Sequence, residues 1–147
     1  ATVTRLAKAY KNIVGIKEAG GDADRVSQLR QALGQAFSIL SGDDALTLPF
    51  MSVGAEGVIS VASNIIPRQL SRMVNSYATG KTAAALKLHQ QYYPIFRDLF
   101  IETNPVPAKA ALAMQGKCAE EYRLPLYKMS ADNRTRLART LKSCGVI

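Results

Sequence analysis

Lys17 is the side chain in this sequence that could carry out covalent chemistry. It lies near the end of the short apolar run NIVGIKEA, residues 12–19, which has the composition of a buried strand. Burial disfavours the charged form of an amine and lowers its pKa, and a neutral amine can form a Schiff base with a carbonyl substrate. A lysine that merely extends from a strand end into solvent is the structural alternative.

The expected position of Lys17 on its strand favours the catalytic interpretation. Side chains alternate between the two faces of a strand, so Ile13, Gly15 and Lys17 are predicted to share one face. If that face lines the inside of a barrel, Gly15 leaves room beneath the lysine side chain. The carboxyl end of a parallel strand is also where α/β folds place their active sites.

Polar and small residues mark the ends of two further predicted strands. The apolar run at residues 37–41 is followed by Gly42, Asp43 and Asp44. These acids could bind a metal, assist proton transfer or cap the next helix, and capping is the commonest of the three roles. A third run begins at Gly57, where the missing side chain allows a close approach of backbone and ligand.

Other kinds of site find little support. His89 is the single histidine and is expected in the middle of a helix, so we predict neither a metal site nor a Ser-His triad. Cys118 and Cys144 lack the spacing of metal ligands and are expected to be reduced thiols. The sequence also has no glycine-rich nucleotide-binding motif.

Strands and helices alternate through residue 80, which predicts a parallel sheet covered by helices. After residue 80 the pattern is helical only, so we predict a βα region at 1–80 and a helical domain at 81–147. The predicted strands are 12–19, 37–41 and 57–62, and the predicted helices are 1–10, about 23–34, 45–53, 67–80, 81–101, 108–115 and one that Ser130 caps.

The chain is basic, with a formal net charge of +8. This charge could reflect nucleic-acid binding, an anionic substrate or no specific partner. Much of the excess lies at residues 123–142, where aromatic side chains are not interleaved with the cations as single-strand binding requires. We therefore favour a solvated basic helix face. No apolar stretch could span a bilayer and no export signal is evident, so we expect no membrane partner and a cytoplasmic location.

Four motifs together resemble the dihydrodipicolinate synthase family: GIKEA at 15–19, SGDD at 41–44, GVISV at 57–61 and NPVPAK at 104–109. They occur in the family's order and at its spacing. The resemblance covers essentially the whole chain, but only the carboxyl-terminal half of the family's sequence. It implies a partial (β/α)8 TIM barrel, equivalent to strands six to eight, followed by the family's C-terminal helical domain.

The resemblance also implies a reaction. Lys17 resembles the lysine that forms a Schiff base with pyruvate, and the resulting enamine attacks aspartate semialdehyde in lysine (diaminopimelate) biosynthesis. Ile59 resembles a residue whose backbone carbonyl lies near the bound pyruvate, and Gly42 resembles a residue that lines the same pocket. No cofactor is implied beyond the covalent pyruvate imine. The turn at Asn104 and Pro105 is interpreted as structural.

The family's tyrosine pair, its carboxylate-binding threonines and its substrate-binding arginine belong to the amino-terminal half and have no counterpart here. A complete barrel needs about 250 residues, and three strands cannot close. We therefore expect a piece of a longer polypeptide, or a half-length product that pairs with another chain, and no normal synthase activity in isolation. The family's usual tetramer suggests a homo-oligomer.

Two alternatives stay open at this point. Other pyruvate-dependent aldolases of the same fold family, N-acetylneuraminate lyase and the 2-keto-3-deoxy sugar acid aldolases, share the lysine. A non-catalytic fragment that acts through association is the other alternative.

Overall fold

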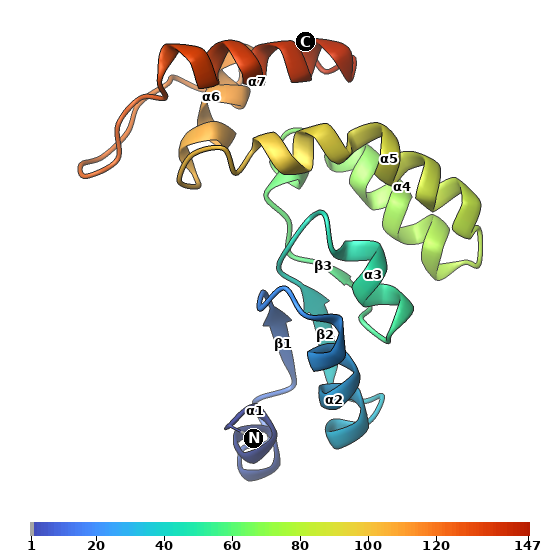
Figure 1. Ribbon diagram of the computed structural model, residues 1–147. Coiled ribbons are helices and arrows are strands. Elements are labelled where there is room, and N and C mark those ends of the chain that lie inside the picture. Colours follow the sequence, from blue (N-terminus) through green and yellow to red (C-terminus); the bar gives the residue numbers. More distant parts are fainter. Residues whose placement is uncertain (1) are drawn as a thin grey trace.

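A short parallel sheet forms the amino-terminal part of the molecule (Figure 1). The computed structural model describes residues 2–147, which contain three strands in the order β1-β2-β3, all parallel. Lys17 lies beside Leu40 in the register of β1 and β2, and Leu40 lies beside Gly57 in that of β2 and β3. Within the described residues, β1 and β3 each pair with β2 alone. The strands are β1 (Gly15–Glu18), β2 (Ser38–Ser41) and β3 (Gly57–Val58).

Helices connect the strands and then continue alone to the carboxyl terminus (Figure 1). Within residues 2–147, a parallel βα arrangement therefore comes first and helices alone follow it. The helices are α1 (Thr2–Ala9), α2 (Ala23–Leu33), α3 (Thr47–Ser52), the 3-10 turn η1 (Ala62–Asn64), α4 (Pro67–Ala78), α5 (Thr82–Asp98), α6 (Val106–Met114) and α7 (Ala131–Ser143). None of those formed by residues 2–147 combines the length and apolar character needed to cross a membrane.

Two hydrophobic clusters hold these elements together. The smaller one packs α2 and α3 against one face of the sheet, with Val26, Ile39 and Phe50 fully buried. The larger one joins α3 and α4 to α5, α6 and α7. Because residues on both sides of position 80 share this larger cluster, its packing continues across the boundary predicted between the βα region and the helical domain.

Local signals account for the helix ends. The Asp22 carboxylate accepts a hydrogen bond from the Asp24 N–H and caps α2, which ends at Gly34 with a positive φ of 69°. Ser130 caps α7 by accepting from the Asn133 N–H. The Ser130 cap matches the sequence prediction. Pro94 lies inside α5, which continues through it to Asp98.

The strands are shorter than the hydrophobic runs predicted. Ile13 lies outside β1 and packs on the helix side, while Val14 is 65% exposed, so the predicted alternation holds only from Gly15 onward. The third run leaves the sheet after Val58 because the N–H groups of Val61 and Ala62 bind a side chain rather than a neighbouring strand. Strand length depends on having a partner, which apolar composition alone does not encode.

Candidate active site

Lys17 projects from the face of the sheet that the helices leave open. Its neighbours in β1, Ile16 and Glu18, face the helices: Ile16 packs on the smaller cluster, and Glu18 is buried and accepts a 2.6 Å hydrogen bond from Arg25 Nε of α2. Alternation along the strand therefore places Gly15 and Lys17 on the opposite face. The salt bridge between Arg25 and Glu18 fixes this orientation of β1.

The Lys17 side chain runs across Gly42, which follows β2. An added Cβ at Gly42 would lie 3.1 Å from Lys17 Cε and 2.6 Å from the Cβ of Ala19. A side chain at position 42 would thus collide with the strand end and with the lysine. The structure brings these two predicted site residues into direct contact.

Gly15 has a different role from the one we predicted. An added Cβ there would lie 2.8 Å from the carbonyl oxygen of Ser38 in β2. The missing side chain at Gly15 therefore allows β1 and β2 to approach, and the room for the lysine comes from Gly42. The two glycines differ from the prediction because each one contacts a residue of the neighbouring strand: Gly15 contacts Ser38, and Gly42 contacts Lys17.

Ile59 comes directly after β3, at the same edge of the sheet. Its N–H donates a 2.8 Å hydrogen bond to the Ser41 carbonyl, and its side chain is 47% exposed. Lys17, Gly42 and Ile59 thus lie at or just beyond the carboxyl ends of three adjacent parallel strands. That edge is where parallel α/β folds place their catalytic groups.

The expectation that Lys17 is buried is wrong for this chain, because its side chain is exposed. The cause is the open sheet. With no further strands beyond β1 and β3 in residues 2–147, nothing covers the face that carries the lysine.

The two acids after β2 are structural. Asp43 Oδ1 accepts hydrogen bonds from the Ala45 N–H at 2.8 Å and the Leu46 N–H at 3.2 Å, in the turn that precedes α3. Within residues 2–147 no side chain caps α3 itself, so the predicted capping role is wrong and Asp43 stabilises the turn instead. The part of the chain that the structure describes holds no cluster of three His, Cys, Asp or Glu side chains able to bind a metal ion.

Asp44 joins the loops that follow β2 and β3, a contact that we did not predict. Its buried carboxylate accepts from the Ser60 hydroxyl, from the Val61 N–H at 3.2 Å and from the Ala62 N–H at 2.9 Å. Burial raises the pKa of this carboxyl, although the hydrogen bonds act in the opposite direction. The sequence does contain a signal for this contact. Asp44 and Ser60 each follow one of two adjacent parallel strands, and the ends of such strands lie close together.

The remaining candidates lie away from this edge of the sheet. His89 packs beside Tyr93 and Phe96 in α5, and burial lowers its pKa. Among the described residues, Cys118 and Cys144 form no disulfide. Asn104 and Pro105, joined by a cis peptide bond, lie in the turn between α5 and α6.

Comparison with known proteins agrees with this geometry. The model of the dihydrodipicolinate synthetase family matches residues 1–144. The 4-hydroxy-tetrahydrodipicolinate synthase of Aquifex aeolicus is 45% identical over 141 residues, which are 96% of this chain and 48% of that protein. The same enzyme of Sulfurihydrogenibium sp. is 48% identical over 147 residues, covering 99% of this chain and 50% of that one.

Solved structures give the same result. The 4-hydroxy-tetrahydrodipicolinate synthase of Methylacidiphilum fumariolicum SolV superposes with a TM-score of 0.96 at 60% identity, over 98% of this chain and 48% of that one. The chain thus spans about half the length of its relatives, and it aligns with their carboxyl-terminal half. With its fold, its motifs and these matches in agreement, the chain belongs to the dihydrodipicolinate synthetase family.

Proposed function

We propose that this chain is the carboxyl-terminal part of a pyruvate-dependent lyase that makes a lysine precursor, and that Lys17 is its Schiff-base residue. The observation that carries the proposal is the position of Lys17 at the carboxyl end of β1, with its side chain crossing Gly42. The relatives named 4-hydroxy-tetrahydrodipicolinate synthase support the choice of reaction.

The chemistry follows from the amine. The neutral Lys17 Nζ attacks the ketone carbon of pyruvate, and loss of water leaves an imine. Loss of a proton from the pyruvate methyl group then forms an enamine, whose carbon bonds to the aldehyde carbon of aspartate semialdehyde. The aldehyde oxygen takes up a proton, and cyclisation releases the lysine. No redox step or added cofactor is needed.

Gly42 and Ile59 are proposed to line the pyruvate site. The absence of a side chain at Gly42 leaves space beside the lysine. A Cβ at this position would lie only 3.1 Å from Lys17 Cε. Ile59 presents its backbone at the same strand edge, where its N–H is already used by the Ser41 carbonyl. Its own carbonyl is the group proposed to face pyruvate.

A complete site requires more of the barrel than this chain contains. Covering the open face would remove water from around Lys17. We propose that a preceding amino-terminal half supplies this cover together with the proton-transfer groups. Self-association of completed barrels is a further proposal. It is separate from the chemistry, because one family structure is described as a monomeric variant.

Reductive trapping tests the proposal. The chain would be incubated with pyruvate and borohydride, alone and with the amino-terminal half of the M. fumariolicum relative, and then digested for mass spectrometry. We expect a reduced pyruvate adduct on Lys17 that the added half strongly increases. Lys17→Arg should abolish the adduct, and Lys128→Arg should retain it.

Each other outcome has a meaning. No adduct on Lys17 in a folded mixture of both halves would contradict the enzymatic role and favour a fragment that acts through association. An adduct without condensation of aspartate semialdehyde, but with condensation of a sugar aldehyde, would assign the chain to another aldolase of the fold family.

A further inference from the structure

The Ile59 backbone is held on both sides, while its carbonyl is left free. On one side the Ile59 N–H donates a 2.8 Å hydrogen bond to the Ser41 carbonyl of β2. On the other side the chain leaves the sheet and turns around the Asp44 carboxylate. Within residues 2–147 no group donates to the carbonyl oxygen of Ile59. The carbonyl assigned above to the pyruvate site is therefore available to a ligand.

One carboxylate holds three consecutive residues of the turn after β3. Asp44 Oδ1 accepts from the Ser60 hydroxyl. Asp44 Oδ2 accepts from the N–H groups of Val61, at 3.2 Å, and Ala62, at 2.9 Å. The Ser60 hydroxyl itself accepts from the Ser63 N–H at 2.8 Å, which leaves its single proton for the carboxylate. The turn is thus built around Asp44.

These contacts restrain the peptide unit that carries the Ile59 carbonyl. A peptide unit is planar, so the direction of its C=O is set once the backbone on both sides is fixed. The unit between Ile59 and Ser60 has the Ile59 N–H bonded within the sheet on one side and the Ser60 side chain bonded to Asp44 on the other. A rotation of this carbonyl would strain one of the two contacts.

Asp44 is anchored on the segment that also bears Gly42. Its side chain is buried, and its own carbonyl accepts from Thr47 Oγ1 at 2.9 Å. The Gly42 N–H donates to the Glu18 carbonyl of β1 at 2.7 Å. Asp44 therefore connects the turn that bears Ile59 to the segment that bears Gly42, and these are the two residues proposed to line the pyruvate site.

The partners of Asp44 differ from those of Asp98, a buried carboxylate between α5 and α7. Asp98 is bonded to Arg97 and Arg136, whereas the partners of the Asp44 side chain within residues 2–147 are a hydroxyl and two N–H groups. A buried carboxylate without a cation is costly to keep. Its presence at this position is explained if the geometry of the turn matters to the site.

We propose that Asp44 is a positioning residue of the pyruvate site, whose carboxylate holds the turn after β3 so that the Ile59 carbonyl faces the reacting atoms beside Lys17. The proposal rests on the proposed function. Pyruvate has no hydrogen-bond donor, so a carbonyl can stabilise only a species that carries a proton. One such species is the carbinolamine, which forms when the lysine nitrogen adds to the ketone carbon and the ketone oxygen takes up a proton. A displaced carbonyl should therefore slow imine formation more than it weakens pyruvate binding.

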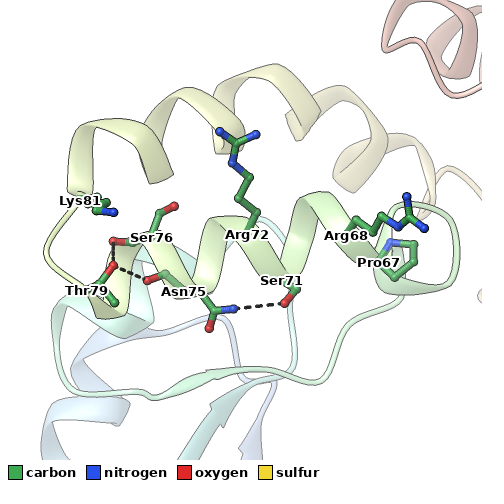
Figure 2. Close-up of a pocket in the computed structure, with 8 residues that line it drawn as sticks. All are labelled: Pro67, Arg68, Ser71, Arg72, Asn75, Ser76, Thr79 and Lys81. Carbon is green, nitrogen blue, oxygen red and sulfur yellow. Dashed lines mark hydrogen bonds between the residues drawn. The ribbon is translucent and has the colours of Figure 1, made fainter.

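The basic groove on α4 supplies a control for general attraction of an anion. Figure 2 shows Arg68 and Arg72 extending from successive turns of the helix, with Lys81 beyond its end. The groove has a volume of about 750 Å³, and all of its lining residues lie between positions 67 and 81. An anion held there lies on α4 rather than at the strand edge. Arg72→Gln should therefore leave imine formation at Lys17 unchanged.

Timed trapping tests the role of Asp44. The chain and the amino-terminal half of the M. fumariolicum relative would be incubated with pyruvate and quenched with borohydride at intervals, and the adduct on Lys17 measured by mass spectrometry. The dependence on pyruvate gives a maximal rate and a half-saturating concentration. We expect Asp44→Asn to lower the maximal rate at least about tenfold and to change the half-saturating concentration about twofold or less. Asp98→Asn, which also removes a buried carboxylate, should leave both values within about twofold.

A matched pair at Ser60 tests the same contact without changing a charge. Ser60→Ala removes the hydroxyl that joins the turn to Asp44, so it should also lower the maximal rate. Ser60→Thr keeps the hydroxyl and should restore the rate. Circular dichroism and urea unfolding check that each variant is folded under the conditions of the assay, and rates are compared per folded complex.

The failures can be told apart. If the wild type forms the adduct and Ser60→Ala keeps its maximal rate, or if Asp98→Asn slows the reaction as much as Asp44→Asn, Asp44 serves the fold alone while the proposed function stands. A raised half-saturating concentration at an unchanged maximal rate would also contradict the positioning of the carbonyl. If the folded wild-type mixture forms no adduct on Lys17, the proposed function fails, and this proposal fails with it.

Discussion

The contact between Gly42 and Lys17 limits which side chains can be accommodated at position 42. An added Cβ at Gly42 would lie 2.6 Å from Ala19 Cβ, closer than real Cβ atoms approach, and 3.1 Å from Lys17 Cε, which is a tight contact. Glycine is therefore required at position 42 by sterics rather than by backbone conformation. The same contact directs the lysine along the strand edge, toward the end of β2.

We predict that Gly42→Ala destabilises the chain by about 1–3 kcal/mol, since the new methyl group must displace Ala19 or the lysine. The free energy of unfolding in urea would measure this. Gly57→Ala is the matched control, because its Cβ would meet Leu40 and Val74 at an ordinary 3.6 Å. Equal effects at the two glycines would show that overlap with Lys17 and Ala19 is not the cause.

The neighbouring acids Asp43 and Asp44 should differ in importance although they are adjacent. Asp44→Ala leaves the N–H groups of Val61 and Ala62 without their acceptor in a buried loop, for which we expect a loss of about 2–4 kcal/mol. Asp43→Ala removes the acceptor of the Ala45 and Leu46 N–H groups at a half-buried position, with an expected cost of about 1 kcal/mol. Urea unfolding of both variants checks the order, and a reversed order would contradict the structural role of Asp44.

At the scale of elements, α5 and α7 are joined by the buried carboxylate of Asp98. Arg97 donates to it from the same helix, and Arg136 and Thr140 donate from α7 at 2.7 and 2.6 Å. Burial alone would raise the pKa of Asp98. The hydrogen bonds and nearby positive charge outweigh burial and lower the pKa to about 2. The ionised carboxylate is thus an integral part of the helical packing.

This lowered pKa predicts how stability depends on pH. An unfolded aspartate titrates near 3.9, so the contribution of Asp98 is fully present above that value and is lost as the pH falls toward 2. The contribution amounts to about 2 kcal/mol by linkage. Urea unfolding between pH 6 and pH 2 (about the range over which the group titrates) should show the loss. The Asp98→Asn variant should be less stable than the wild type at pH 6, and its free energy of unfolding should change less between pH 6 and pH 2. A parallel decline in the variant would assign the loss to other groups.

Elements defined by local signals could be predicted from the sequence, and those defined by neighbours could not. The caps at Asp22 and Ser130 act within a few residues, so α2 and α7 begin where predicted. The extent of β3 depends on a partner strand, and the roles of Gly15 and Gly42 depend on which side chain lies across the sheet. Strand alternation correctly placed Lys17 on its face but could not reveal that the face is open.

At the scale of the whole molecule, the open sheet explains why the lysine is exposed. Three strands present two unpaired edges within residues 2–147, and the family fold pairs every strand in a closed barrel. The chain has its own buried clusters, so it can fold around the helix-covered face while the other face stays in water. Fold and activity should therefore be separable in this chain.

We accordingly predict that the isolated chain is folded but does not condense pyruvate with aspartate semialdehyde at a measurable rate. Adding the amino-terminal half should restore turnover in proportion to the complex formed, because we propose that this half covers Lys17 and supplies the proton-transfer groups. The rate would be followed with the chain held constant and the added half increased, with Lys17→Arg as the inactive reference. The concentration of the added half that gives half the maximal rate should equal the dissociation constant of the two halves measured by calorimetry. Such agreement would identify the complex as the catalyst. Turnover by the chain alone, at the level of a complete relative, would show that three strands suffice.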